Sequence, residues 1–123
     1  MSKPTQITWL DQPEDHDYPA AASYLSLLYP ARKAQQLSQA LKKAPITKFK
    51  AKDIFRASRL PLLDASNSHV QKDVKIIRGG GSLSPVLLVR NSVQGKVIVA
   101  DGYHRVCAVY SFDEDAMIPC KIV

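Results

Sequence analysis

The chain has 123 residues, a length that suits one globular domain. It is 46% hydrophobic and 23% charged, ordinary values for a globular protein, and its formal net charge is +6. No run of about eighteen apolar residues occurs, which excludes a transmembrane helix. The first residues lead into no apolar signal core, so we expect a cytoplasmic protein with no membrane partner.

The positive charge is concentrated in the middle of the chain. Residues 32–90 carry thirteen Lys and Arg against three Asp, a balance of +10, whereas residues 1–31 sum to −3. A basic middle indicates an anionic partner such as a nucleotide or a nucleic acid. The alternative is that these lysines and arginines only form a solvated surface.

The N-terminal third is predicted to hold an arm and two helices. Residues 1–19 are polar and contain three prolines, so we expect an irregular, loosely tethered arm. Apolar residues recur at helical spacing in 20–29 and again in 31–44, and a proline ends each helix. Ala21, Tyr24, Leu25 and Leu28 are expected to share one apolar side of the first helix.

The middle of the chain is predicted to alternate a strand with helices. Apolar and lysine residues alternate over 47–52, as in a strand that is wet on one face. Residues 53–58 suit one helical turn. Ser68 and Gln71 form a capping-box pair, which predicts that the next helix begins just after Ser68. Gly79 is expected to supply the left-handed residue at the end of that helix.

The last third has the pattern of buried strands around one helix. Residues 86–90 and 97–100 are short, β-branched runs, and the loop between them resembles a hairpin. A short helix should follow Arg105, and residues 118–123 should form a closing strand. Pro119 favours a position for that strand at the edge of the sheet, or a start just beyond the proline.

Several reactive residues are expected to have no chemical role. Cys107 and Cys120 do not form a CxxC pair, and core packing is predicted for both. His16 and His69 have no partners at metal-ligand spacing, and no metal site is predicted from them. The acidic residues at 113–115 could bind Mg²⁺ together with a nucleotide, but a solvated loop is the preferred interpretation.

The strongest signal for a site is Asp101-Gly102-Tyr103-His104-Arg105, which joins a buried strand to a helix. Gly102 lets the backbone approach a ligand closely. The N–H groups and dipole of the helix favour an anion at the same place. His104 and Arg105 add donors, and the guanidinium fork matches phosphate oxygens. The segment therefore predicts a phosphate site, that of a nucleotide, with Asp101 as the nearest residue to act as a base or orient a metal.

A purely structural interpretation of these residues stays open. Asp101 could be a helix cap, Gly102 a turn residue, and Arg105 a surface partner. Tyr103 could stack on a base or pack as a half-buried aromatic side chain. The glycines at 79–81 are predicted to end the helix and form a flexible loop. The alternative is that this loop covers part of the bound ligand.

Two motifs in this order resemble those of the ParB/sulfiredoxin-like superfamily. That superfamily includes the N-terminal domain of ParB partition proteins, sulfiredoxins, free-serine kinases and ParB-like nuclease domains. Gly81-x-x-Ser84-Pro85 is similar to its G-x-x-Q-P box, with Ser84 in place of the glutamine. Gly102-x-x-Arg105 is similar to its G-[EHC]-[RH]-R box.

The resemblance implies a fold and a set of site residues. The fold would be α+β, with a small mixed β-sheet and flanking helices over residues 46–123. An N-terminal arm and helical extension at 1–45 would pack with it as a single unit. Catalytic roles would fall to Asp101 and His104, and the nucleotide phosphates would be bound by Gly81, Ser84, Gly102, Tyr103, His104 and Arg105.

Differences between this sequence and members of the family reduce the number of activities that we expect. Sulfiredoxins have a cysteine where this chain has Tyr103, so sulfinic-acid chemistry is not expected. ParB partition proteins continue into a helix-turn-helix domain, whereas this chain stops at Val123. We therefore expect no reader of DNA sequence in the major groove.

Two classes of function fit the sequence. The first is a nucleotide-binding phosphotransferase or nucleotide hydrolase that uses ATP or CTP with Mg²⁺. The second is a non-catalytic module that binds nucleic acid or a protein through residues 32–90. A nuclease ranks last, because the chain lacks the carboxylate cluster of two-metal nucleases. The sequence leaves the acceptor substrate and the oligomeric state open, a homodimer included.

Overall fold

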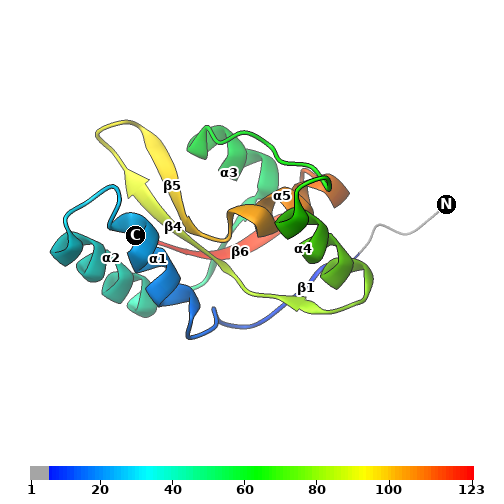
Figure 1. Ribbon diagram of the computed structural model, residues 1–123, viewed down its shortest axis with the longest axis horizontal. Helices are drawn as coiled ribbons and strands as arrows, with labels where there is room; N and C mark the ends of the chain where they lie inside the picture. The colour runs from blue at the N-terminus through cyan, green and yellow to red at the C-terminus, as the bar shows by residue number, and fades with distance from the viewer. Residues whose placement is uncertain (1–5) are drawn as a thin grey trace.

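The structure is a computed structural model, and it describes residues 6–123. Figure 1 shows the helices around a central sheet. In chain order the elements are β1 Thr8–Trp9, α1 Asp17–Leu25, α2 Ala31–Lys43, β2 Thr47–Lys50, α3 Ala51–Ser58, α4 Ser68–Arg78, β3 Ser82–Leu83, β4 Val86–Asn91, β5 Lys96–Asp101, α5 Tyr103–Phe112 and β6 Met117–Ile122. None of these helices is long and apolar enough to cross a membrane, within the part of the chain described.

The main sheet has four strands in the order β2-β6-β4-β5. β4 and β5 form the predicted antiparallel hairpin, β6 pairs antiparallel with β2, and β4 and β6 run parallel. A second, two-stranded sheet joins β1 and β3 in parallel. The predicted α+β class, with a small mixed sheet and flanking helices, is confirmed.

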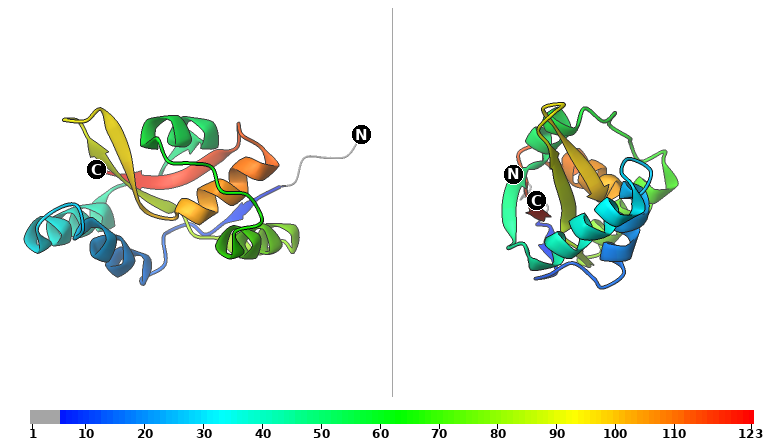
Figure 2. Two further views of the ribbon diagram at one scale, coloured as in Figure 1. Left: turned by 45° about the horizontal axis from the view of Figure 1, so that its top comes forward. Right: turned by 90° about the vertical axis from the view of Figure 1, so that its left-hand side faces the viewer.

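The central strand β4 separates two hydrophobic cores. Val86 and Leu88 face the core covered by α3, α4 and α5, whereas Leu87 and Val89 face the core under α1 and α2. Figure 2 shows α1 and α2 on one side of the sheet and the other helices on the opposite side. Because both faces are covered, β4 is a continuous apolar run instead of an alternating one. The two N-terminal helices are thus part of the packed structure.

The predicted irregular arm is wrong in part. Residues 1–5 lie outside the described residues, but Thr8–Trp9 pairs with Ser82–Leu83 and α1 begins at Asp17. Pro19 does not prevent this start, because a proline in the first helical turn lacks only an N–H that has no partner there.

The earlier start also changes the face that α1 buries. Its buried residues include Tyr18, Ala21 and Leu25, at spacings of three and four. Of the four residues predicted to share one apolar side, Ala21 and Leu25 are buried, whereas Tyr24 and Leu28 are 41% and 50% exposed. The helix ends at Leu25, so Leu28 lies beyond its last turn. The prediction is confirmed for Ala21 and Leu25 and wrong for Tyr24 and Leu28, because it placed the helix three residues too far along the chain.

Three local assignments differ from the predictions around α3 and α4. The single turn expected at 53–58 is the longer helix Ala51–Ser58. The cap of α4 is Asn67, whose side chain accepts the N–H groups of His69 and Val70 at 3.0 and 3.2 Å. Asparagine caps as well as serine does, so the capping-box pair misplaced the cap by one residue. The left-handed residue after α4 is Gly80, at φ 75°, one residue later than expected.

Pro119 does not place its strand at the edge of the sheet. β6 lies between β2 and β4, and Pro119 is opposite Lys48 of β2. Pairing of β6 with β4 starts only at Cys120. The proline therefore precedes the part of the strand that has neighbours on both sides, where a missing N–H would leave a gap in the ladder.

The two cysteines pack in the core as predicted. Cys107 and Cys120 are free and buried. Burial raises the pKa of the Cys107 thiol, and it raises the pKa of the Cys120 thiol to about 12. Because the thiolate is the reactive form, both groups are chemically quiet.

Candidate phosphate site

The turn from β5 into α5 can only be made by glycine. Gly102 has φ 106°, in the region that residues with a Cβ rarely adopt. A Cβ at this position would lie 2.5 Å from Val86 Cγ1 and 2.8 Å from Arg105 Nη2. The backbone therefore passes directly over β4 and leaves room for the Arg105 side chain to fold back beside it.

Helix α5 begins earlier than the sequence predicted. It starts at Tyr103, so His104 and Arg105 belong to its first turn instead of preceding it. The first intrahelical bond at this end runs from the Val106 N–H to the Gly102 carbonyl, at 3.0 Å. The N–H groups of the three residues before Val106 have no acceptor within the helix, which leaves a positive end at the turn.

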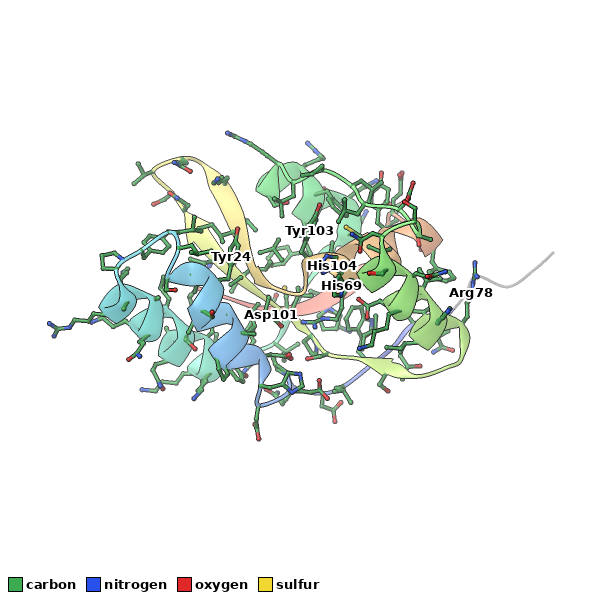
Figure 3. The ribbon with its side chains drawn as sticks, viewed as in Figure 1. Tyr24, His69, Arg78, Asp101, Tyr103 and His104 are labelled. Carbon is green, nitrogen blue, oxygen red and sulfur yellow. The ribbon has the colours of Figure 1, made fainter. Side chains whose placement is uncertain are left out.

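A pocket of about 180 Å³ lies where this turn meets α4. The structure brings together at this pocket the five consecutive residues that the sequence singled out. Figure 3 shows Asp101, Tyr103 and His104 converging near His69 of α4. The lining residues are His69, Lys72, Asp73, Asp101, Gly102, Tyr103, His104 and Arg105.

Three aromatic rings line up along one side of the pocket. The ring centroids of His69 and His104 are 4.7 Å apart, and those of Tyr103 and His104 are 5.4 Å apart. The Tyr103 hydroxyl donates a hydrogen bond to the Pro61 carbonyl. Tyr103 is therefore a half-buried side chain that ties the segment before α4 to α5.

The Arg105 guanidinium has hydrogen-bond partners at Nη2 but not at Nε. Its Nη2 lies 2.8 Å from Asp101 Oδ2 and 3.5 Å from the Pro85 carbonyl, and its side chain is 17% exposed. Its Nε is buried and has no hydrogen-bond partner among the described residues. An unpaired buried donor is costly, so this N–H calls for an acceptor that the protein does not supply.

Burial shifts the pKa values of the groups that face the pocket. Desolvation raises the pKa of Asp101 and of Asp73, although Arg105 opposes the shift in both. Desolvation, followed by the charge of His69, lowers the pKa of His104. The pocket thus holds carboxyl groups that tend to take up a proton and an imidazole that tends to lose one.

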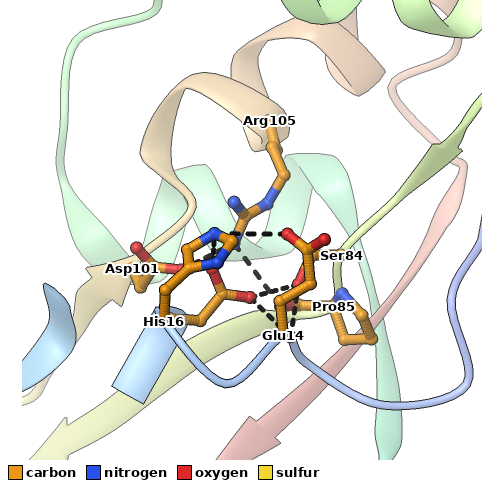
Figure 4. A network of polar contacts seen from close by, with 7 residues as sticks. Glu14, His16, Ser84, Pro85, Asp101 and Arg105 are labelled. Carbon is orange, nitrogen blue, oxygen red and sulfur yellow. Dashed lines mark hydrogen bonds and ion pairs between the residues drawn. The ribbon is translucent and has the colours of Figure 1, made fainter. Parts of the chain in front are cut away.

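A second polar group adjoins Asp101 from the N-terminal segment, and the sequence analysis missed it. Asp17 is only 2% exposed, and its Oδ2 accepts the Glu14 N–H at 3.0 Å and a hydrogen bond from the Ser84 hydroxyl. Burial raises the pKa of Asp101, and the charge of Asp17 adds to that shift. Figure 4 shows Glu14, His16 and Ser84 gathered near Asp101 and Arg105.

Helical spacing contained the signal for Asp17. Had α1 been started at Asp17, the carboxylate would have fallen on the same stripe as Ala21 and Leu25, both fully buried. A carboxylate on a buried stripe is a polar group that needs partners. The irregular-arm assignment concealed this pattern.

The other predicted site residues lie outside the pocket. Ser84 is buried in the Asp17 network, where it serves as a hydrogen-bond partner. Gly81 lies in the connection between α4 and β3, and a Cβ there would come within 2.9 Å of Ile76 Cγ2. Its absence of a side chain is explained by packing against α4.

One group of residues has ligand atoms close enough to hold a metal ion. In the region from 6 to 123, only Glu14, His16 and Asp17 bring three such atoms within 4.8 Å of one another. His16 Nε2 lies 3.2 Å from Glu14 Oε2 and 3.4 Å from Asp17 Oδ1, which are ion-pair distances. Glu14 and Asp17 lie beside His16 because α1 begins at Asp17.

The acidic loop after α5 forms ion pairs with two lysines. Asp115 Oδ1 lies 2.6 Å from Lys52 Nζ and 3.9 Å from Lys50 Nζ, and Glu114 accepts a hydrogen bond from Tyr110 at 3.2 Å. These contacts join the start of α3 to the end of α5. They agree with a solvated, structural loop.

Comparison with known proteins does not place the chain in a family. No protein-family model, curated protein or solved structure matches it significantly. The function of the pocket is therefore inferred from its own chemistry.

Replacing Gly102 by alanine should destabilise the fold strongly. Gly102→Ala adds a strained φ to a close contact with Val86, and together these should cost about 3 kcal/mol in the free energy of unfolding. Urea denaturation followed by circular dichroism measures this. The matched control is Gly95→Ala, at φ 64° with nothing within 4 Å of its Cβ, which should lose only about 1 kcal/mol. Equal losses in the two variants would contradict the close approach at Gly102.

Proposed function

We propose that the pocket at the start of α5 binds the phosphate of a nucleotide or of another small phosphate ester. The observation that carries this proposal is the buried Arg105 Nε, which has no acceptor among residues 6–123. A phosphate oxygen is an acceptor that a guanidinium binds well. The resemblance of Gly102-x-x-Arg105 to a phosphate-binding box of the ParB/sulfiredoxin-like superfamily supports the same proposal.

The surroundings of Arg105 suit an anion. Lys72, His69 and His104 line the same pocket, and the N-terminal end of α5 points into it. A pocket of about 180 Å³ is small and accommodates a phosphoryl group more readily than a whole nucleotide. The base and sugar of a nucleotide would therefore lie outside, along the rings of His104 and His69.

Two carboxyl groups oppose an anion in the pocket. Asp73 and Asp101 balance the formal charges of Lys72 and Arg105, so the pocket has no excess of fixed positive charge. Mg²⁺ bound to the nucleotide phosphates would offset this, because its charge attracts both carboxylates. For this reason ATP or CTP with Mg²⁺ is the ligand that we propose, ahead of free phosphate.

The same groups would support phosphoryl transfer or hydrolysis. Arg105 and His104 would stabilise charge on the transferring phosphoryl group. Asp101 would act mainly by orienting Arg105, since its Oδ2 is already committed to that side chain. His104, with a lowered pKa, is the group best able to accept a proton from a nucleophile.

Ligand binding should depend on Arg105. Thermal-shift and calorimetric titrations with ATP, CTP, ADP and inorganic phosphate, each with and without Mg²⁺, should show a rise in melting temperature, since a ligand of the native state stabilises it. In Arg105→Gln the affinity should fall about a hundredfold, as expected for a lost charged hydrogen bond of about 3 kcal/mol.

The matched control is Arg78→Gln, which removes the same charge from the far end of α4, away from the pocket (Figure 3). Its affinity should equal that of the wild type. No binding of any of these ligands by the wild-type protein, or equal losses in the two variants, would reject the proposed function.

Anion affinity should rise as the pH falls. Burial lowers the pKa of His104 in the free protein, whereas a bound anion favours the imidazolium. Binding therefore takes up a proton, and affinity increases on lowering the pH from about 8 to about 5, the range of histidine titration. Sulfate is the probe, because it stays a dianion throughout this range. His104→Gln should flatten the profile, and the slope that remains would come from Asp73 and Asp101, whose pKa values burial raises. A profile unchanged in His104→Gln would contradict this role.

A second candidate function rests on α2. This helix carries Arg32, Lys33, Lys42 and Lys43 and no acidic residue. All four are exposed, and none forms an ion pair with a described residue. An unpaired basic helix face is typical of surfaces that contact nucleic-acid phosphates.

Binding of nucleic acid through α2 should weaken steeply with salt. In the double variant Lys33→Gln/Lys43→Gln, the slope of log affinity against log salt for duplex DNA should fall by about 2, one unit for each lost phosphate contact. Fluorescence anisotropy measures this. Lys52→Gln is the control, because its ammonium is already paired with Asp115. No binding of DNA at low salt would remove this second function.

A further inference from the structure

A second pocket lies at the other end of the sheet, and the proposed function does not use it. It has a volume of about 250 Å³ and opens between α3 and the main sheet. Figure 1 shows α3 beside the hairpin of β4 and β5. Val97 of β5 lines this pocket, whereas Asp101, at the opposite end of the same strand, lines the phosphate site. The two pockets share no lining residue, so each can be tested without the other.

The floor of this second pocket is an apolar face of the main sheet. Leu88, Val97 and Ile122 come from the neighbouring strands β4, β5 and β6, and Phe49 comes from β2. The register of the strands places these four side chains on one face of the sheet. Leu88 is buried, but Phe49, Val97 and Ile122 are only partly buried. The described part of the protein therefore leaves apolar surface uncovered on three strands at once.

Helix α3 forms the roof of the pocket and leaves it open because one roof residue is small. Ile54 and Ala57 are three residues apart on the side of α3 that lines the pocket. Ile54 is 3% exposed and closes the inner part, whereas Ala57 is exposed and lies at the opening. A long side chain at position 57 would lean toward the N-terminal end of α3 and cover the opening. Alanine at this position keeps the pocket accessible.

The charges at the opening favour an anion. Six of the eight lining residues are apolar, and the two charged ones are Asp53 and Arg90. Asp53 Oδ1 lies 3.5 Å from Arg56 Nη1, so the negative charge of Asp53 is offset. The guanidinium of Arg90 forms no ion pair with any residue in the range 6–123. These three side chains sum to +1, and the unpaired cation is the one that lines the pocket.

We propose that this second pocket binds a small apolar carboxylate, with the hydrocarbon part against Phe49, Val97 and Ile122 and the carboxylate on Arg90. A guanidinium binds a carboxylate through two parallel hydrogen bonds. Pockets for drug-sized ligands have volumes of about 300–1,000 Å³, so this one takes a smaller molecule. A medium-chain fatty acid has this chemistry, because it carries one anionic group at the end of a short apolar chain. The site is separate from the proposed phosphate function and does not depend on it.

Calorimetric titration of the full chain with a series of carboxylates from butanoate to octanoate tests the proposal. The ligands are kept below the concentrations at which they aggregate. Affinity should rise about fourfold for each added methylene group, because each one buries a similar apolar area, and should level off once the pocket is full. 1-Octanol has the same chain length and no charge. It should bind about tenfold more weakly than octanoate, since it lacks the ion pair with Arg90.

Two variants separate the apolar part of the pocket from its charge. Ala57→Leu should abolish the binding of octanoate and leave folding intact, because leucine suits an exposed helix position. Arg90→Gln should lower the affinity for octanoate about tenfold and leave the affinity for 1-octanol unchanged. The matched controls are Ala40→Leu and Arg32→Gln, at exposed positions of α2 that line no part of this pocket. Both controls should bind octanoate as the wild type does.

Three results would overturn the proposal. The first is no binding of octanoate by the wild-type protein, or equal affinities of the wild type and Ala57→Leu. The second is an equal loss for octanoate and 1-octanol in Arg90→Gln, which decides the matter if Ala57→Leu does not fold. The third concerns another occupant, a second copy of the chain. If sedimentation velocity shows that the wild type self-associates and Ala57→Leu does not, the pocket belongs to that copy and the carboxylate is rejected.

Discussion

The site depends on the close approach of the Gly102 backbone to Val86. Any Cβ at Gly102 would fall within 2.8 Å of Arg105 Nη2, in the space that the arginine side chain uses. Because this space is free, Arg105 can fold back from the first turn of α5 and reach both Asp101 and the Pro85 carbonyl. The ion pair, the unpaired Nε and the shape of the pocket all follow from that one absent side chain.

The charges around the pocket are balanced, and this decides which ligands suit it. A site made only of cations would attract any anion and would be costly to fold. Here Asp73 and Asp101 offset Lys72 and Arg105, and burial lowers the pKa of His104, which favours its neutral form. Such a site favours an anion that arrives with a cation or a proton, which is the physical reason to expect a magnesium-bound nucleotide.

Sequence patterns predicted the parts of the structure that local chemistry controls. The hairpin of β4 and β5, the amphipathic α2 and the convergence of residues 101–105 follow from apolar runs, helical spacing and a glycine turn. Features set by distant contacts could not be found in this way. Pro119 is tolerated in an inner strand only because β4 begins one residue further on, and β1 exists only because β3 is there to pair with it.

Asp17 shows why the site was only half predicted. Its hydrogen-bond partner Ser84 is remote in the sequence, and the two residues meet only after α1 packs on the sheet. No spacing rule connects an acidic residue near the N-terminus with a serine so far along the chain. A correct start for α1 would have placed a carboxylate on a buried stripe, but its partners would still have been unknown.

The pairing of β1 with β3 gives the chain a natural optical probe. The chain has one tryptophan, Trp9, and it lies in β1 opposite Leu83, partly buried against the larger core. Its fluorescence emission therefore reports whether the N-terminal segment is packed against the rest of the molecule. Since that segment also carries Glu14, His16 and Asp17, indole fluorescence can follow the attachment of half of the polar network while circular dichroism follows the helices.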